Sequence, residues 1–276
     1  IGALLYYARA VNNKLLATLS TLSSQQATAT EATAEAVNQL LDYRATYPDD
    51  GATHCSSDMI LCAHVDAGFL NESQSRSRAG AHIYLSENDA FPRFNGAVLS
   101  IAQIIKFVMA SAAESELAAL FVTAREMIPH RQTIITMGWP QPKPAIQTDN
   151  STVEGVINSR VRLKRTKSMD MRFEWLLDRE QQGQFKIYWR PGKTNLADYF
   201  TKHHPPAHHR NVRGEFLTRL ADVLRLRQEQ ASSSETGLAM TDGPCFRNFL
   251  QGCVNISVNS VRKLSENGSK YLNPNF

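Results

Sequence analysis

The sequence predicts an α/β fold in which helices flank a mixed sheet, with a small helical segment preceding the sheet domain. Two observations lead to this prediction. Between residues 59 and 202, three strand candidates come first, and helix and strand candidates alternate after them. This order is typical of a mixed sheet whose faces are covered by helices. The composition is also that of a globular protein, with 42% hydrophobic and 20% charged residues in a chain of 276.

Short stretches rich in apolar, β-branched or aromatic residues are the strand candidates. The first, MILCAHV at 59–65, is almost entirely apolar, as expected of a strand that is buried on both faces. The others lie at 79–86, 97–109, 145–148 and 185–189. The predicted sheet therefore has five strands.

Helical spacing of apolar residues and capping residues predict the helices around this sheet. They cover 1–22, 27–46, 112–125 and 168–182, together with the stretches that Asn150 and Asn195 open. Pro129 is expected to break the chain into a long loop, because proline disrupts a helix interior.

Composition limits the classes of function. The formal charge is +4, from 30 Lys and Arg against 26 Asp and Glu, which weakly favours an anionic partner. No run of 18 apolar residues is present, so we expect no membrane span and no membrane partner. No secretory signal is visible, and the four cysteines lack disulfide or zinc spacing, so free thiols and an intracellular location, cytoplasmic or nuclear, are expected.

Carboxylates stand at informative places along the predicted sheet. Asp66 is expected to close the first strand, Asp149 closes the fourth, and Asp198 lies in the first turn of the last helix. If the first and fourth strands are neighbours, Asp66 and Asp149 lie side by side, since sites form where adjacent strands end. Helix 112–125 offers Glu114 or Glu116, but each lies about 80° from the centre of its apolar face, so periodicity does not choose between them.

Crowded carboxylates repel one another, and a hard divalent cation removes that penalty. Oxygen ligands of this kind suit Mg²⁺ or Mn²⁺, and two such ions about 3.5–4 Å apart can activate water in phosphoryl chemistry. Each acid alone has an ordinary explanation as a turn, cap or solvated residue. Only the ordered set Asp–Glu–Asp–Asp supports a metal centre.

From Ile1 to about His204, five motifs resemble the C-terminal part of a copia-type retrotransposon polyprotein. They are HVDAGF (64–69), AAESELAAL (112–120), QTDNS (147–151), RTKSMDMRF (165–173) and NLADYFTK (195–202). The resemblance implies that 1–50 is the helical end of a reverse transcriptase and its connection, and that 52–204 is an RNase H-like domain. Residues 205–276 are expected to be a partly helical, flexible tail.

The resemblance also implies a function: metal-dependent cutting of the RNA strand of RNA–DNA hybrids. It assigns catalysis and the binding of two Mg²⁺ or Mn²⁺ ions to Asp66, Glu116, Asp149 and Asp198. Glu116 is preferred to Glu114 because Glu-Leu-x-Ala at 116–119 repeats the pattern found after the catalytic Glu in related RNases H. The implied partners are a hybrid duplex and the reverse transcriptase portion of the same polyprotein.

Two departures from the family pattern bear on activity. The loop at 190–194 lacks the His that many RNases H carry there, which lowers the expected rate. The Tyr-x-Asp-Asp polymerase signature is absent, so the chain is not expected to synthesise DNA.

Basic residues concentrate beside the predicted site. Between 158 and 202, eleven Lys and Arg stand against five Asp and Glu, and such a segment can neutralise phosphates without reading sequence. The expected hybrid-binding residues are Arg160, Arg162, Lys164, Arg165, Lys167 and Lys193. Trp175 and Trp189 are expected in the core.

Two other functions fit parts of the same pattern. A catalytically inactive nucleic-acid-binding or connection module of a decayed copia-type reverse transcriptase would bind a hybrid without cleaving it. A relative of integrases or transposases would share the sheet but carry a Glu on the last helix, where this chain has Asp198.

Overall fold

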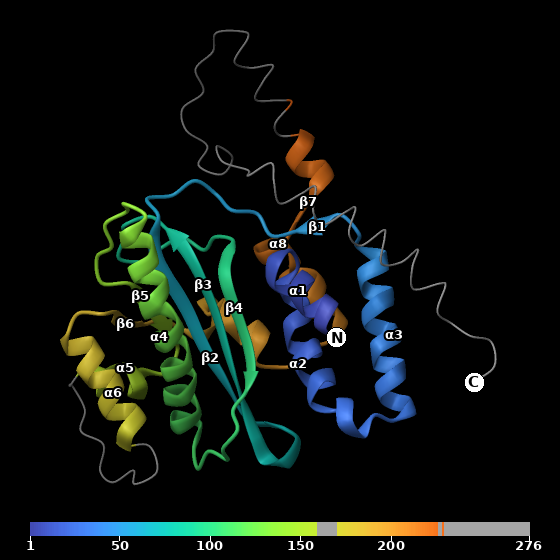
Figure 1. The fold of residues 1–276 in the computed structure, drawn as a ribbon, viewed down its shortest axis with the longest axis horizontal. Helices are drawn as coiled ribbons and strands as arrows, with labels where there is room; N and C mark the ends of the chain where they lie inside the picture. Colours follow the sequence, from blue (N-terminus) through green and yellow to red (C-terminus); the bar gives the residue numbers. More distant parts are fainter. Residues whose placement is uncertain (159–169, 226–227, 229–276) are drawn as a thin grey trace.

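A computed structural model describes residues 1–158, 170–225 and 228. Its centre is a five-stranded mixed sheet with strand order β4-β3-β2-β5-β6 (Figure 1). The strands are β2 (Ile60–Glu72), β3 (Arg76–Ser86), β4 (Ala97–Ile104), β5 (Ala145–Thr148) and β6 (Lys186–Trp189). Strands β2, β3 and β4 pair antiparallel, whereas β5 lies parallel to both β2 and β6. The predicted fold class, an α/β mixed five-stranded sheet flanked by helices, is confirmed.

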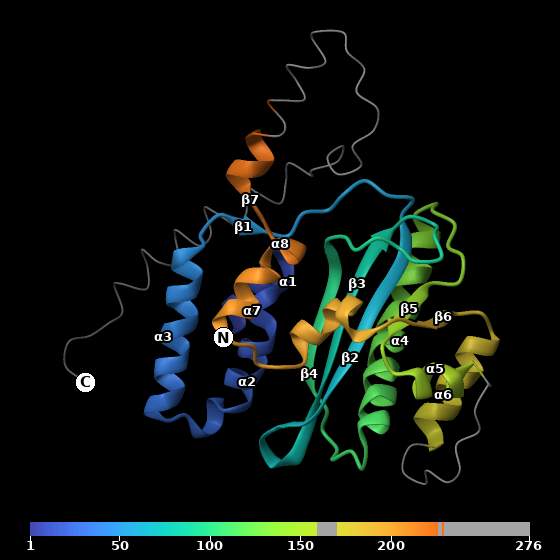
Figure 2. The same ribbon diagram turned by 180° about the vertical axis from the view of Figure 1, so that it is seen from behind.

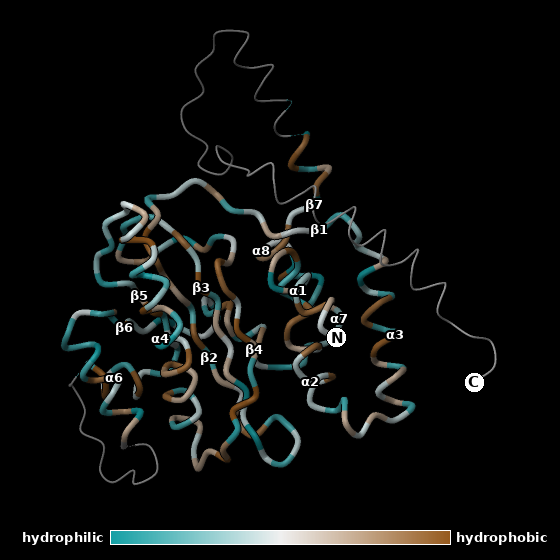
Figure 3. Tube along the Cα trace, in the orientation of Figure 1, coloured by the Kyte–Doolittle hydropathy of each residue, from teal (hydrophilic) through white to brown (hydrophobic). Residues whose placement is uncertain are grey.

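Three helices cover one face of this sheet and contribute to a common hydrophobic core. They are α4 (Ala112–Thr136), α5 (Ser151–Ile157) and α6 (Asp170–Gln181). Alternate residues of β2, among them Leu61, Ala63 and Val65, pack against Leu120 of α4 in this core. Figure 3 shows the pattern as hydrophobic stretches along the strands, with a hydrophilic connection between β2 and β3.

The opposite face carries a second hydrophobic cluster, built from both ends of the described chain (Figure 2). Leu19 and Leu40 come from the N-terminal helices, and Phe200, Phe216 and Leu217 come from the segment after the sheet. The N-terminal elements are α1 (Gly2–Ala10), η1 (Asn13–Leu15), α2 (Leu16–Ser24), η2 (Gln26–Thr28) and α3 (Glu31–Thr46). The later elements are η5 (Leu196–Phe200), α7 (Pro206–Asn211) and α8 (Arg213–Phe216).

The described chain after residue 204 begins with short elements that pack on the N-terminal helices. Besides α7 and α8, it contains β7 (Thr218–Arg219), which pairs antiparallel with β1 (Asp50–Gly51). Phe216 and Leu217 are each 4% exposed, so burial against the N-terminal helices holds this segment in place. We therefore propose that residues 205–219 belong with residues 1–50 in one packing unit.

The predicted ends of two strands and the predicted type of one helix were wrong. The first strand does not end before Asp66 but continues to Glu72, so Asp66 pairs with Gly80 inside the β2–β3 ladder. The third strand ends at Ile104, not at residue 109. The helix predicted to open at Asn195 is a short 3₁₀ helix, η5, although Asn195 does cap it by accepting a hydrogen bond from the amide of Ala197.

Helix α4 also runs through Pro129, where a break was expected. Proline inside a helix removes one amide donor and costs ~3 kcal/mol. Met127 and Ile134, on either side of it, are 1% and 9% exposed, and their burial in the core offsets that cost. None of the helices in the described ranges has the length and apolarity needed to cross a lipid bilayer.

Candidate metal centre

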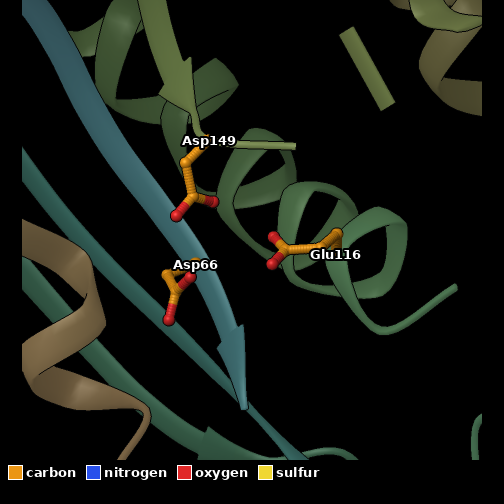
Figure 4. Close-up of side chains that lie close together, drawn as sticks. All are labelled: Asp66, Glu116 and Asp149. Carbon is orange, nitrogen blue, oxygen red and sulfur yellow. The ribbon is translucent and has the colours of Figure 1, made fainter. Parts of the chain in front are cut away.

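Three carboxylates from separate elements meet beside the middle of the sheet. Asp66 lies in β2, Glu116 lies near the start of α4, and Asp149 directly follows β5. Each offers one oxygen, and these oxygens all lie within 4.8 Å of one another. Figure 4 shows the Glu116 side chain extending from its helix toward the two aspartates.

The strand pairing explains why the two aspartates are neighbours. In the parallel ladder of β2 and β5, His64 is paired with Gln147. Asp66 and Asp149 each come two residues later, so they reach the same level of the sheet. The sequence predicted this adjacency on the condition that the first and fourth strands are neighbours, and the β2–β5 pairing meets that condition, although Asp66 lies within its strand and not at the end.

The helix supplies the third carboxylate through Glu116, not Glu114. The Glu114 carboxylate instead accepts a hydrogen bond of 2.8 Å from the amide of Ala110, beside the Ser111 cap of α4. Both glutamates are 8% exposed, so burial does not distinguish them; position does. Only Glu116 belongs to the three-carboxylate cluster.

Burial and mutual repulsion make this cluster electrostatically costly without a cation. Burial raises the pKa of Asp66 to about 6, helped by the charges of Asp198 and Asp149 and opposed by a hydrogen bond that the Thr201 hydroxyl donates. Burial and the charges of Asp66 and Asp149 raise the pKa of Glu116 to about 9. Both shifts follow from holding negative charge in a poorly solvated place beside like charge.

The cluster fits a hard divalent cation. One oxygen of Glu116, Oε2, is buried and has no hydrogen-bond partner among the described residues. A buried polar atom without a partner is costly, and a cation bound between the carboxylates would satisfy it. The donors are carboxylate oxygens, which suit Mg²⁺ or Mn²⁺ better than thiophilic metals.

Asp198, the fourth expected residue, is close but not part of this three-oxygen group. Its Oδ1 accepts a hydrogen bond from the ammonium of Lys202, one helical turn later. Its Oδ2 lies 4.0 Å from Nε2 of His204. Asp198 nevertheless lies close enough for its charge to raise the pKa of Asp66.

Thr201 and Lys202 are site residues that the sequence reasoning did not single out. Thr201 binds Asp66, and Lys202 binds Asp198. Gly80 permits this approach, because a Cβ there would lie 2.5 Å from Cγ2 of Thr201. Both residues belong to the NLADYFTK motif at 195–202, in which only Asp198 was predicted to be a site residue.

A tryptophan and a glycine approach Asp149 from the end of β6. The indole of Trp189 donates a hydrogen bond of 2.9 Å to the backbone carbonyl of Asp149. Trp189 is 45% exposed, so the expectation that it lies in the core was wrong. A Cβ at Gly192 would lie 2.8 Å from Oδ2 of Asp149, so a side chain there would crowd the carboxylate. Trp175 is partly buried and packs on the core.

Of the expected nucleic-acid-binding residues, Lys193 lies in η4 (Gly192–Thr194) and is exposed beside Asp149's neighbour Gly192. The five others lie outside the described residues: Arg160, Arg162, Lys164, Arg165 and Lys167.

Fold and site together define an α/β protein with a five-stranded mixed sheet and a buried three-carboxylate cluster across β2, α4 and β5. No family model matches the chain. Over 169 residues, 61% of the chain, it is 24% identical to the retrovirus-related Pol polyprotein from transposon TNT 1-94 of Nicotiana tabacum. The chain spans 12% of the length of that polyprotein. The expected resemblance to a copia-type retrotransposon polyprotein is thus confirmed.

RNases H are among the solved structures to which the chain is similar. An RNase H1 isolated from compost by a metagenomic approach is 12% identical with a TM-score of 0.40, over 52% of this chain and 93% of that one. The same enzyme in complex with an RNA/DNA hybrid is 10% identical with a TM-score of 0.38, over 51% of this chain and 93% of that one. RNase H1 from Halobacterium salinarum is 16% identical with a TM-score of 0.34, over 51% of this chain and 94% of that one. Because these similarities are low, the fold class is assigned from the strand order of the chain itself.

Proposed function

We propose that this chain is the RNase H portion of a retroelement polyprotein and that it cuts the RNA strand of RNA–DNA hybrids. One observation carries the proposal: carboxylates of Asp66, Glu116 and Asp149, far apart in the sequence, offer oxygens within 4.8 Å of one another. The similarity to a retrotransposon Pol polyprotein supports the same RNase H-type function.

Asp66, Glu116 and Asp149 would hold two Mg²⁺ or Mn²⁺ ions, with Asp198 as a fourth ligand once it leaves Lys202. When bound, such ions activate water and stabilise the leaving oxygen of a phosphodiester. The products would be a 5′-phosphate and a 3′-hydroxyl.

The surrounding residues keep the carboxylates in place. Thr201 orients Asp66 by donating a hydrogen bond from its hydroxyl to Oδ2, and the side-chain amide of Asn195 donates a 2.7 Å hydrogen bond to the carbonyl of Val65 in the same strand. Trp189 anchors the backbone of Asp149. These contacts fix the ligands before a cation arrives, which reduces the reorganisation needed on binding.

Positive charge around the site would hold the hybrid backbone. Lys193 is exposed beside Asp149, and the basic run from Arg160 to Lys167 lies in the neighbouring segment of the sequence. Contacts of this kind would position the duplex without reading its bases. The helices of residues 1–50 would connect the domain to the reverse transcriptase portion of the same polyprotein.

The matched pair Glu116→Gln and Glu114→Gln tests the proposal. Each is incubated, as the full chain, with a labelled RNA–DNA hybrid and Mg²⁺ or Mn²⁺. Glu116→Gln is expected to abolish cleavage, and Glu114→Gln to retain it, because glutamine can still accept the hydrogen bond from Ala110. Equal cleavage by both variants, or none by the wild type, would contradict the proposal.

One observation favours a second candidate, a nucleic-acid-binding module without catalysis. Asp198 is paired with Lys202 and stands apart from the three-carboxylate group. If that pair persists, the site keeps three carboxylates and turns over poorly. Salt-dependent binding of the hybrid without cleavage by the wild type would support this alternative.

A further inference from the structure

A cavity of about 350 Å³ lies between the N-terminal helices and the segment after the sheet, away from the carboxylate cluster. Helix α3 contributes Ala36 and Tyr43 to its lining, η1 contributes Lys14, and η5 contributes Tyr199. None of the three cluster carboxylates lines it. Its volume falls at the lower end of the ~300–1,000 Å³ typical of small-molecule sites.

The cavity lining is cationic. Lys14, Arg210 and Arg213 line it, and no Asp or Glu does. Arg213 is neutralised by its ion pair with Asp50 and lies over the Tyr47 ring. Arg210 is exposed, and no ion pair joins it or Lys14 to an acid in the described ranges. Two cations in the cavity are therefore without an ion pair, although the charge of Asp50 acts on Lys14.

Lys14 is unusual because its charge is buried. The residue is 4% exposed, and its ammonium donates one hydrogen bond of 2.7 Å to the carbonyl of His209. Burial, together with the nearby charge of Arg213 and against the opposing charge of Asp50, lowers the pKa of Lys14 to about 8. A buried ammonium is costly unless an anion pairs with it. An anionic group in the cavity would supply that pairing.

The other wall of the cavity is aromatic. Tyr43 and Tyr47 pack edge to face at 5.2 Å between ring centroids, and Tyr199 lies beneath Lys14. The hydroxyl of Tyr43 is buried and has no hydrogen-bond partner in the described part of the chain. Arg213 covers the ring of Tyr47 and Lys14 covers the ring of Tyr199, so Tyr43 is the tyrosine of the lining on which a flat ring would stack. Its hydroxyl can bind a polar edge.

We propose that this cavity binds a nucleoside 5′-monophosphate, with the phosphate at Lys14 and Arg210 and the base against Tyr43. Two separated cations suit a doubly charged phosphate better than a singly charged carboxylate. The same chemistry is presented by a free mononucleotide and by the 5′-phosphorylated end of a strand. The inference does not depend on the proposed cleavage activity.

Isothermal titration calorimetry of the full chain in EDTA tests the proposal. The ligands are adenosine 5′-monophosphate, adenosine, inorganic phosphate, and a triadenylate with or without a 5′-phosphate. Lys14→Met and Arg210→Ala remove the cations, and Ala36→Trp fills the cavity while leaving the cations in place. Arg125→Ala, which removes an exposed charge on α4, and Asp149→Asn are controls. Thermal melting checks that each variant is folded.

Adenosine 5′-monophosphate is expected to bind. Adenosine is expected to bind about 100-fold more weakly, because it loses the charge-assisted contacts to both Lys14 and Arg210, and inorganic phosphate about tenfold more weakly, because it loses the stacking of the base. Lys14→Met, Arg210→Ala and Ala36→Trp are each expected to weaken binding about tenfold or more. The controls should match the wild type. If the 5′-phosphorylated triadenylate binds more tightly than the mononucleotide, the ligand is a strand end. If the mononucleotide binds more tightly, the ligand is a free nucleotide.

Absence of binding to the wild type at millimolar ligand would overturn the proposal. Unchanged affinity in folded Ala36→Trp and Arg210→Ala would also overturn it. A third contrary result is that the triadenylate binds equally with and without its 5′-phosphate while the mononucleotide does not bind. Loss of binding in Asp149→Asn alone would place the ligand at the carboxylate cluster and reject this cavity.

Discussion

Replacement of Glu116 by glutamine is expected to stabilise the metal-free protein near neutral pH. Burial and the charges of Asp66 and Asp149 raise the pKa of Glu116 from 4.5 to about 9 in the folded chain. Because the folded-state pKa is the higher one, the glutamate's contribution to stability is complete below pH 4.5 and is lost as the pH rises through about 9. Glutamine has no proton to lose, so its contribution does not change over this range.

The size of the effect follows from the pKa of the unfolded glutamate. At pH 7, the unfolded chain has released this proton, whereas the folded chain retains it at a cost of 1.36 kcal/mol per pH unit above 4.5. Glu116→Gln should therefore raise the free energy of unfolding by about 3 kcal/mol at pH 7 and by almost nothing near pH 4. For a chain of this size, the corresponding rise in Tm is roughly 6–12 °C.

Urea denaturation in EDTA at pH 4 and pH 7 measures this difference. Glu114→Gln is the matched control, because Glu114 lies on the same helix and is equally buried but stands outside the three-carboxylate cluster. The reasoning is refuted if Glu116→Gln is no more stable than the wild type at pH 7, or if its gain is the same at both pH values.

Three further predictions concern neighbouring residues. Lys202→Met should tighten Mn²⁺ binding about two- to fivefold in calorimetry, because the Lys202 ammonium no longer pairs with the Asp198 carboxylate. The magnitude follows from the contribution of exposed ion pairs, which is at most ~1 kcal/mol. Gly80→Ala should lower the free energy of unfolding in urea by about 1–3 kcal/mol, since its Cβ would lie 2.5 Å from a Thr201 side-chain atom. His82 is buried with its pKa lowered to about 4, so the folded chain binds its proton less readily than the unfolded chain. Stability should fall as the pH drops from about 6.5 toward 4, and thermal melts of His82→Gln should show a smaller fall.

Each of these has a clear contrary result. Weaker or unchanged Mn²⁺ affinity in Lys202→Met would mean that the ammonium does not compete for Asp198. Wild-type stability of Gly80→Ala would show that the close approach of η5 to β3 is not a constraint. An identical acid response in His82→Gln would assign that response to other groups.

The order of strands and helices could be predicted from the sequence because it depends on local apolar periodicity. The adjacency of Asp66 and Asp149 then followed from the parallel pairing of the first and fourth strands. The end of β2 was mistaken because a charged residue in a strand normally marks its edge, whereas Asp66 is accommodated by Thr201, 135 residues away. No local pattern reports such a contact.

The choice between Glu114 and Glu116 illustrates the same limit. Both flank the apolar face of one helix, so the distinction depends on how α4 is rotated and seated against β2. The pairing of Lys202 with Asp198 and the packing of Phe216 on the N-terminal helices likewise depend on tertiary structure. The sequence contains the residues but not the distances between them.

The central claim is that Asp66, Glu116 and Asp149 together bind divalent cations. Anomalous diffraction from crystals of the full chain grown with Mn²⁺ tests it most directly. The account predicts an anomalous peak bonded to oxygens of all three carboxylates, and its loss in Glu116→Gln but not in Glu114→Gln. A manganese peak elsewhere, with none between these three side chains, would contradict it.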